Sequence, residues 1–175
     1  MFTLAFTRRY SMSHRLLSLQ SGKCGIPHGH NEYVTVKLAA REPGPLDGEA
    51  NMVTPFHDAK KRWHAWIDHA VDHSLQLSGR DPLLDYFREH EPEQLHRILV
   101  TPGDPSTEVL AACFMAKIQA FLADQGDGLR CIEVRIEETP TNTVIFDGDP
   151  AAVLPAGGSP GPTWWQRADD SINDL

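Results

Sequence analysis

Apolar and polar residues alternate along stretches near both ends of the chain, which predicts β-strands there. Within residues 28–40, for example, Val34, Val36 and Leu38 fall on one side of an extended chain. A tight turn at residues 140–142 joins the last two alternating stretches. The predicted strands are residues 1–9 (continuing into 11–25, which ends as a loop), 28–40, 129–139 and 143–147.

Between these strands, apolar residues recur at steps of three and four, the period of an amphipathic helix. One such stretch covers residues 55–75 and another covers about residues 104–124. The intervening residues 76–104 are expected to form a long irregular connection, with some helical content around residues 81–90.

The resulting order of elements is ββααββ, which predicts an α+β fold with a hairpin at each end and a helical pair between them. A length of 175 residues is that of one domain. Residues 150–175 lose the periodicity and are expected to form an extended or partly disordered tail, although Trp164 and Trp165 could dock elsewhere.

The composition is that of an ordinary globular protein, with 41% hydrophobic and 23% charged residues. No apolar run approaches the ~18 residues that a membrane helix needs, and the first residues do not fit a secretory signal. A net charge of −8 without a basic stripe disfavours nucleic-acid binding. Three widely spaced cysteines argue against a disulfide framework and predict a reducing, cytoplasmic setting.

Nine histidines are the unusual feature of the composition, and they favour a metal site or an acid–base site. His28 and His30 are two apart on a predicted strand, so both imidazoles point to the same face, about 6–7 Å apart at their Cα atoms. His14, at the end of the first strand, can supply a third ring. Three histidines with an open fourth position are typical of catalytic zinc. The alternative is a loop with solvated imidazoles.

Three further features are candidates for acid–base chemistry. Three interpretations of Cys24 are open: a further zinc ligand, a small buried residue or a reactive thiolate. Asp72-His73 ends the first predicted helix, either as a pair that moves a proton or as a cation near the helix C-terminus. Asp68-His69 repeats the dipeptide four residues earlier, so the local sequence does not distinguish between them.

Glu138 lies in phase with the apolar positions of the strand over residues 129–139. A carboxylate on that face needs a charge-assisted partner, such as two adjacent N–H donors of a ligand. The alternative is that the strand ends at Glu138 and the side chain reaches water.

Six short motifs, in this order along residues 1–149, resemble those of the 6-pyruvoyltetrahydropterin synthase/6-carboxytetrahydropterin synthase family. They are SHRL (13–16), CGIPHGHN (24–31), NMVTPF (51–56), VDH (71–73), PSTE (105–108) and IEET (136–139). The sequence departs from the family pattern at Pro55, at residues 74–76, in the long stretch 76–104 and in the tail.

This resemblance implies a role for each matching residue. The zinc ligands would be His14, His28 and His30, the catalytic residues Cys24, Asp72 and His73, and the pterin-binding residues Glu138, Ser106 and Thr107. The implied fold is the T-fold, an antiparallel four-stranded sheet with two helices on one face. Residues 1–149 would form this catalytic domain, and subunits would assemble into a hexamer, a dimer of trimers, with each site at a subunit boundary.

The three residues between Cys24 and the HGH motif are similar to the spacing in the carboxy-forming, queuosine-pathway branch of the family. The implied reaction converts 7,8-dihydroneopterin triphosphate to 6-carboxy-5,6,7,8-tetrahydropterin, acetaldehyde and triphosphate. One alternative is the pyruvoyl-forming enzyme, which eliminates triphosphate without cleaving a carbon–carbon bond. Another is a non-catalytic pterin-binding or zinc-binding protein of the same fold. Arg15 and Lys23 are candidate cations for the triphosphate.

Overall fold

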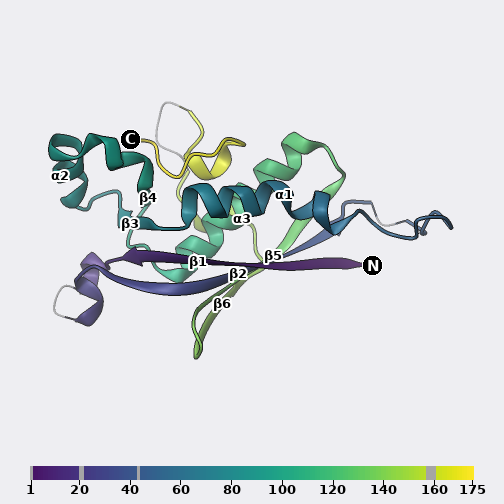
Figure 1. Ribbon diagram of the computed structural model, residues 1–175, viewed down its shortest axis with the longest axis horizontal. Helices are drawn as coiled ribbons and strands as arrows, with labels where there is room; N and C mark the ends of the chain where they lie inside the picture. Colours follow the sequence, from purple (N-terminus) through teal and green to yellow (C-terminus); the bar gives the residue numbers. More distant parts are fainter. Residues whose placement is uncertain (1, 20–21, 43, 157–160) are drawn as a thin grey trace.

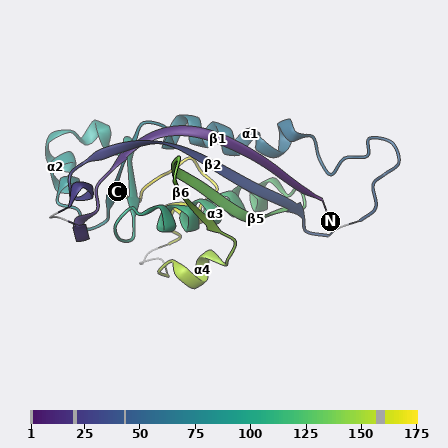
Figure 2. The same ribbon diagram turned by 90° about the horizontal axis from the view of Figure 1, so that it is seen from below.

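The computed structural model describes residues 2–19, 22–42, 44–156 and 161–175. Its centre is one mixed sheet with the strand order β4-β3-β1-β2-β5-β6. Two long, curved strands, β1 (Thr3–His14) and β2 (His28–Ala40), form an antiparallel hairpin that follows the long axis of the molecule (Figures 1 and 2). Strands β5 (Leu129–Thr139) and β6 (Asn142–Phe146) continue the sheet antiparallel beside β2.

Two helices cover one face of this sheet, α1 (Phe56–Trp66) and α3 (Thr107–Gln125) (Figure 1). The alternation in β2 places Val34, Val36 and Leu38 toward the helices, where none of them is exposed. Trp63 and Phe114 contact each other edge to face between the two helices, with ring centroids 5.8 Å apart. The core therefore lies between the helices and the even-numbered residues of the long hairpin.

The predicted α+β T-fold is confirmed, with two more strands than the four expected. Strand β3 (Ser74–Ser78) pairs in parallel with the end of β1, and β4 (Ile98–Thr101) pairs in parallel with β3. Both strands fall where a helix end and an irregular connection were expected. Apolar residues of both strands pack on α2 (Leu83–His90) in a small cluster. Each strand is short, and its parallel partner lies far away in the sequence, so no neighbouring hairpin signals it.

The first helix is shorter than its apolar pattern suggested. It ends in a π-helical turn, Ile67–Val71, after which Asp72 is extended and His73 has a positive φ of 64°. These two residues reverse the chain into β3. The apolar residues after residue 71 therefore belong to a strand and not to the helix.

The described residues beyond 149 do not form the extended or partly disordered tail that the lost periodicity predicted, and Trp164 and Trp165 dock on the rest of the fold, which was the alternative. The described residues of this region include the helix α4 (Pro150–Val153) and a 3₁₀ turn at Trp164–Gln166. Trp164, Trp165 and Ile172 are buried, and they belong to the main apolar core. This segment covers an apolar surface of α3. Burying the tryptophan rings against that surface removes apolar area from water, which stabilises the packing.

Candidate metal and pterin site

The end of the long hairpin brings the three predicted histidines together. His14 is paired directly with His28 across the two strands, and His30 pairs with Met12, so all three rings rise from the helix-covered face. The ring nitrogens can all lie within 4.8 Å of one another, and the Nε2 atoms of His14 and His28 are 3.1 Å apart. This spacing fits one metal ion bound by three imidazoles.

Two of the three imidazole rings are oriented by a hydrogen bond at Nδ1, which leaves Nε2 facing the point where the three rings converge. The Nδ1 atom of His14 lies 2.9 Å from the carbonyl oxygen of Pro105, and that of His28 lies 2.9 Å from the carbonyl of Ile26. A carbonyl only accepts, so each Nδ1 carries the proton and each Nε2 is left with a lone pair. Burial also lowers the pKa of His14, which favours the neutral, ligating form.

Gly29 lets the two strands approach at this point. A Cβ atom built on it would lie 2.7 Å from the carbonyl oxygen of Met12, closer than atoms pack. The absence of a side chain between His28 and His30 thus sets the close pairing with β1 from which the triad is made.

A cavity of about 470 Å³ opens beside His14, between the start of α3 and the β5–β6 hairpin. Ser106, Thr107 and Glu138 line it. The hydroxyl of Thr107 donates to Oε1 of the half-buried Glu138 at 3.0 Å. Glu138 therefore faces a ligand-sized space.

Glu32 is a buried acid next to the site that the sequence analysis did not single out. It has no exposed surface, and the hydroxyl of Tyr10, directly opposite on β1, donates to its Oε2 atom. Burial raises the pKa of Glu32 to about 7. The sequence contains a signal for this residue. Glu32 comes two residues after His30 and in phase with His28, so the strand alternation places its carboxylate on the same face as the histidines and the core residues.

Cys24 lies in a 3₁₀ turn, Lys23–Gly25, in the loop that joins β1 to β2. Its carbonyl oxygen accepts a hydrogen bond of 2.8 Å from the Leu16 amide, which ties this loop to the residues just after His14. Of the three cysteines it alone is partly exposed, since Cys113 and Cys131 are buried and burial raises the pKa of both thiols. Within the described chain its thiol does not belong to the metal-binding group.

Asp72 and His73 form a pair at the edge of β1, where Asp72 Oδ2 lies 2.8 Å from Nδ1 of His73. The Ser11 amide donates to the other carboxylate oxygen at 2.7 Å, and the Ser11 carbonyl accepts from the His73 amide at 2.7 Å. Burial by itself would raise the pKa of Asp72, but these donors hold it below its usual value. The His73 side chain is 77% exposed and lines no described part of the 470 Å³ cavity.

The second Asp-His pair is engaged differently. Asp68 accepts two hydrogen bonds from Arg8, at 2.6 and 2.7 Å, and His69 is exposed. Arg15, one of the candidate triphosphate cations, is held by the fully buried carboxylate of Asp81. Its guanidinium is therefore committed within the fold, whereas Lys23 is exposed.

Comparison with known proteins agrees with this geometry. A family model described as 6-pyruvoyl tetrahydropterin synthase matches residues 3–149. The chain belongs to the 6-pyruvoyl tetrahydropterin synthase family. The match includes the histidine triad, the Asp72-His73 pair and Glu138, and it ends where the C-terminal part of this chain begins.

Relatives within the 6-pyruvoyl tetrahydropterin synthase family carry the name of the carboxy-forming branch. A protein of Halobacterium salinarum named probable 6-carboxy-5,6,7,8-tetrahydropterin synthase is 28% identical over 137 residues, covering 77% of this chain and 79% of that protein. The 6-carboxy-5,6,7,8-tetrahydropterin synthase of Bacillus subtilis is 26% identical over 145 residues, covering 83% and 84%.

Solved structures share the fold. An uncharacterized protein of Wolinella succinogenes superposes with a TM-score of 0.67 at 20% identity, over 85% of this chain and 98% of that one. The 6-pyruvoyl tetrahydropterin synthase of Caenorhabditis elegans superposes with a TM-score of 0.57 at 24% identity, over 85% and 96%. At these identities the likeness establishes the T-fold only.

Proposed function

We propose that this protein is a zinc-dependent 6-carboxy-5,6,7,8-tetrahydropterin synthase acting on 7,8-dihydroneopterin triphosphate. The observation that carries the proposal is the convergence of three imidazole nitrogens beside a cavity into which an acid projects. Family membership supports the pterin substrate class. The names of the relatives from Halobacterium salinarum and Bacillus subtilis support the carboxy product.

The residues present fit zinc. His14, His28 and His30 offer three imidazole nitrogen donors, two of them oriented by carbonyl oxygens, which is the donor set of catalytic zinc with a position left for substrate. When bound there, zinc supplies Lewis-acid polarisation of the substrate's side-chain oxygens.

The pterin ring would be held by its N–H edge. The two carboxylate oxygens of Glu138 can accept from two adjacent ring donors, and Thr107 fixes the carboxylate by its own hydroxyl. Ser106, which caps α3 through a 3.5 Å contact with the Val109 amide, completes this wall of the cavity. Fixing the ring sets the side chain of the substrate against the histidines, which is the positioning part of catalysis.

Proton transfer is assigned to Cys24, Asp72 and His73. The partly exposed thiol of Cys24 would act as a thiolate that removes a proton from the substrate or returns one to it. The Asp72–His73 pair would complete the acid–base set by holding a proton on its imidazole. His73 is exposed at a strand edge, away from the cavity of its own chain. We therefore propose that a site is completed by a neighbouring subunit, within a hexamer built as a dimer of trimers.

The functional unit coincides with the part of the chain that the family model matches. We propose that residues 1–149 form the pterin-binding catalytic domain, since the family model and all the assigned site residues fall within them. Among the described residues, no helix combines the length and apolar character needed to cross a bilayer.

Product analysis separates the three candidate functions. We expect the zinc-loaded protein to release acetaldehyde and triphosphate in equal amounts from 7,8-dihydroneopterin triphosphate, leaving a product with the mass of 6-carboxytetrahydropterin. Triphosphate without acetaldehyde would identify the pyruvoyl-forming enzyme instead. Pterin binding without release of either would identify a non-catalytic binding protein. A Cys24→Ala variant, prepared in parallel, controls for activity from contaminating enzymes.

A further inference from the structure

Residues 161–175, which we call the C-terminal segment, fold back over α3 and end beside β4 (Figure 1). They lie beyond the residues that the family model matches. We propose that the C-terminal segment is a positioning element for the histidine site, acting through β4, with Trp164 as its key residue. The metal-binding part of this inference rests on the proposed function.

Trp164 anchors the C-terminal segment in the core. Its ring is fully buried and stacks on Trp66, with centroids 6.2 Å apart and an angle of 26° between the planes. Its carbonyl oxygen accepts from Nζ of the buried Lys117 at 2.9 Å. Its indole Nε1 donates to the carbonyl oxygen of Val100 at 2.7 Å, which joins the segment directly to β4.

Two more hydrogen bonds tie the segment to the same strand. The Val100 amide donates to the carbonyl of Ile172 at 3.0 Å, and Nδ2 of Asn173 donates to the carbonyl of Ile98 at 2.7 Å. Strand β4 is the edge strand on this side of the sheet. It pairs with β3 along one edge, and within the described chain the backbone groups along its other edge have no strand beside them. The C-terminal segment therefore supplies partners for backbone groups that an edge strand otherwise leaves to water.

Internal contacts hold the C-terminal segment in this shape. Arg167 donates to Asp169 at 3.0 Å, to the carbonyl of Pro162 at 3.0 Å and to Ser171 at 2.9 Å. Arg62 of α1 binds the carbonyl of Ala168. The segment is thus a cross-linked unit fixed to both helices and to β4, and not a peptide that adheres at one point.

Strand β4 leads straight into the residues that orient the site. The chain leaves β4 at Thr101 and enters α3 at Thr107. Between them, Asp104 accepts from the backbone just after His14, at the Leu17 amide (3.0 Å). Pro105 offers the carbonyl that fixes His14 Nδ1 at 2.9 Å. A shift of β4 would therefore move the acceptor that sets the ligating nitrogen of His14.

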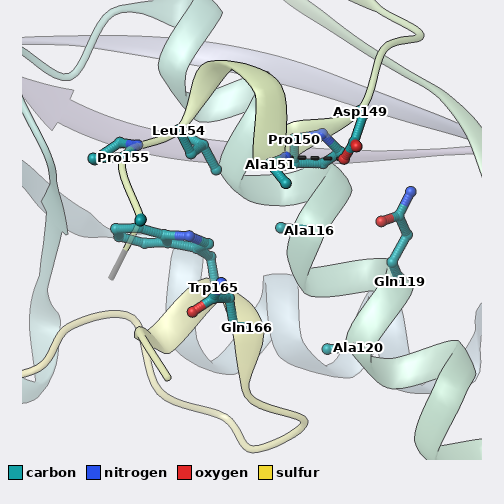
Figure 3. Close-up of a pocket in the computed structure, with 11 residues that line it drawn as sticks. Ala116, Gln119, Ala120, Asp149, Pro150, Ala151, Leu154, Pro155, Trp165 and Gln166 are labelled. Atoms are coloured by element: carbon teal, nitrogen blue, oxygen red, sulfur yellow. Dashed lines mark hydrogen bonds between the residues drawn. The ribbon is translucent and has the colours of Figure 1, made fainter. Parts of the chain in front are cut away.

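The test uses Trp164→Phe, which keeps an aromatic ring for stacking but removes the N–H that binds Val100. Trp165→Phe is the matched control. Trp165 is also buried, but its ring lines a pocket together with Ala116 and Leu154 (Figure 3), and in the described chain its indole nitrogen has no hydrogen bond to β4. Asn173→Asp is a second test variant, because it sets a carboxylate against the Ile98 carbonyl.

Three quantities are measured on the full chain: amide hydrogen exchange by mass spectrometry, zinc affinity by competition with a chromophoric chelator, and the melting temperature. We expect Trp164→Phe and Asn173→Asp to speed exchange in residues 98–107 of the metal-free protein and to weaken zinc binding roughly 10-fold, as for loss of an outer-shell partner. Exchange in β1, β2 and β5 should be unchanged, and Trp165→Phe should match the wild type in zinc affinity and in exchange of residues 98–107, even where loss of buried ring volume lowers its melting temperature.

Two results would overturn the proposal. One is wild-type exchange in residues 98–107 in both test variants. The other is a lower melting temperature with unchanged zinc affinity, which would make the C-terminal segment merely stabilising. If the wild-type protein itself fails to bind zinc, the proposed function fails, while the exchange measurement on metal-free protein still decides whether the segment orders residues 98–107.

Discussion

Replacing Lys117 by methionine should make the protein more stable at neutral pH. Lys117 is fully buried on α3, surrounded by the rings of Trp66, Phe121 and Trp164 at 5.3–5.8 Å from its Nζ atom. Burial lowers its pKa from 10.5 to about 8, against the opposing attraction of Asp169. Methionine has a similar length and shape without the charge, so it can fill the same space.

The size of the effect follows from that pKa. A decrease of this size corresponds to about 3 kcal/mol of unfavourable free energy for keeping the ammonium charged in the folded protein. Against this, the variant loses the hydrogen bond to the Trp164 carbonyl and the contacts with the aromatic rings, together worth about 1–2 kcal/mol, whereas the attraction of Asp169 is already included in the lowered pKa. The Trp164 carbonyl keeps a partner in the Arg167 amide (3.3 Å), so it is not orphaned. We expect a net gain of about 1–2 kcal/mol at pH 7.

The dependence on pH gives the sharper test. Below about pH 8 the lysine is protonated in both the folded and unfolded states, and the full penalty is present. Between about pH 8 and 10.5 the unfolded chain binds more protons than the folded protein, so wild-type stability gains from this group as the pH rises. The variant lacks that gain. Its advantage should therefore shrink across this range.

Urea unfolding of both proteins between pH 7 and 10.5 measures this difference directly. Lys61→Met, at an exposed position on α1, is the matched control and should change the free energy of unfolding by less than about 0.5 kcal/mol. The reasoning is refuted if Lys117→Met is less stable than the wild type at pH 7. It is also refuted if the difference between them does not decrease above pH 8.

The remaining predictions concern the site. His28→Ala and His30→Ala should each lose most bound zinc from a wild-type content of about one ion per subunit, by metal analysis; full retention in both would exclude this assignment. Cys24→Ala should keep zinc and fold but lose most turnover, because the thiol acts on protons and not as a ligand; loss of metal would make it a ligand instead. His73→Ala should lower turnover roughly 10²–10⁴-fold, whereas His69→Ala should change it little, because His69 faces solvent beside an aspartate already bound to arginine. Steady-state rates at saturating zinc test this pair, and the reverse order would show that the relay lies one helical turn earlier.

The sequence determined the features that depend on local periodicity. Alternation along β2 put His28 and His30 on one face together with Val34 and Val36, because successive side chains of a strand point to opposite sides. The order of short motifs predicted the T-fold and the family, both of which are confirmed. The roles of Cys24 and the other catalytic residues stay predictions.

Tertiary structure decided what depends on residues far apart in the chain. The carbonyl that orients His14 is 91 residues away, at Pro105, and no local pattern announces it. Lys117 is fully buried because the C-terminal segment covers that side of α3, where the Trp164 carbonyl accepts from its Nζ atom. The parallel pairs of β3 and β4 likewise exist only through long-range contacts. A local pattern of apolar and polar residues fixes the face to which a side chain points. Which segment packs against that face depends on contacts between residues far apart in the chain, and local periodicity does not encode those contacts.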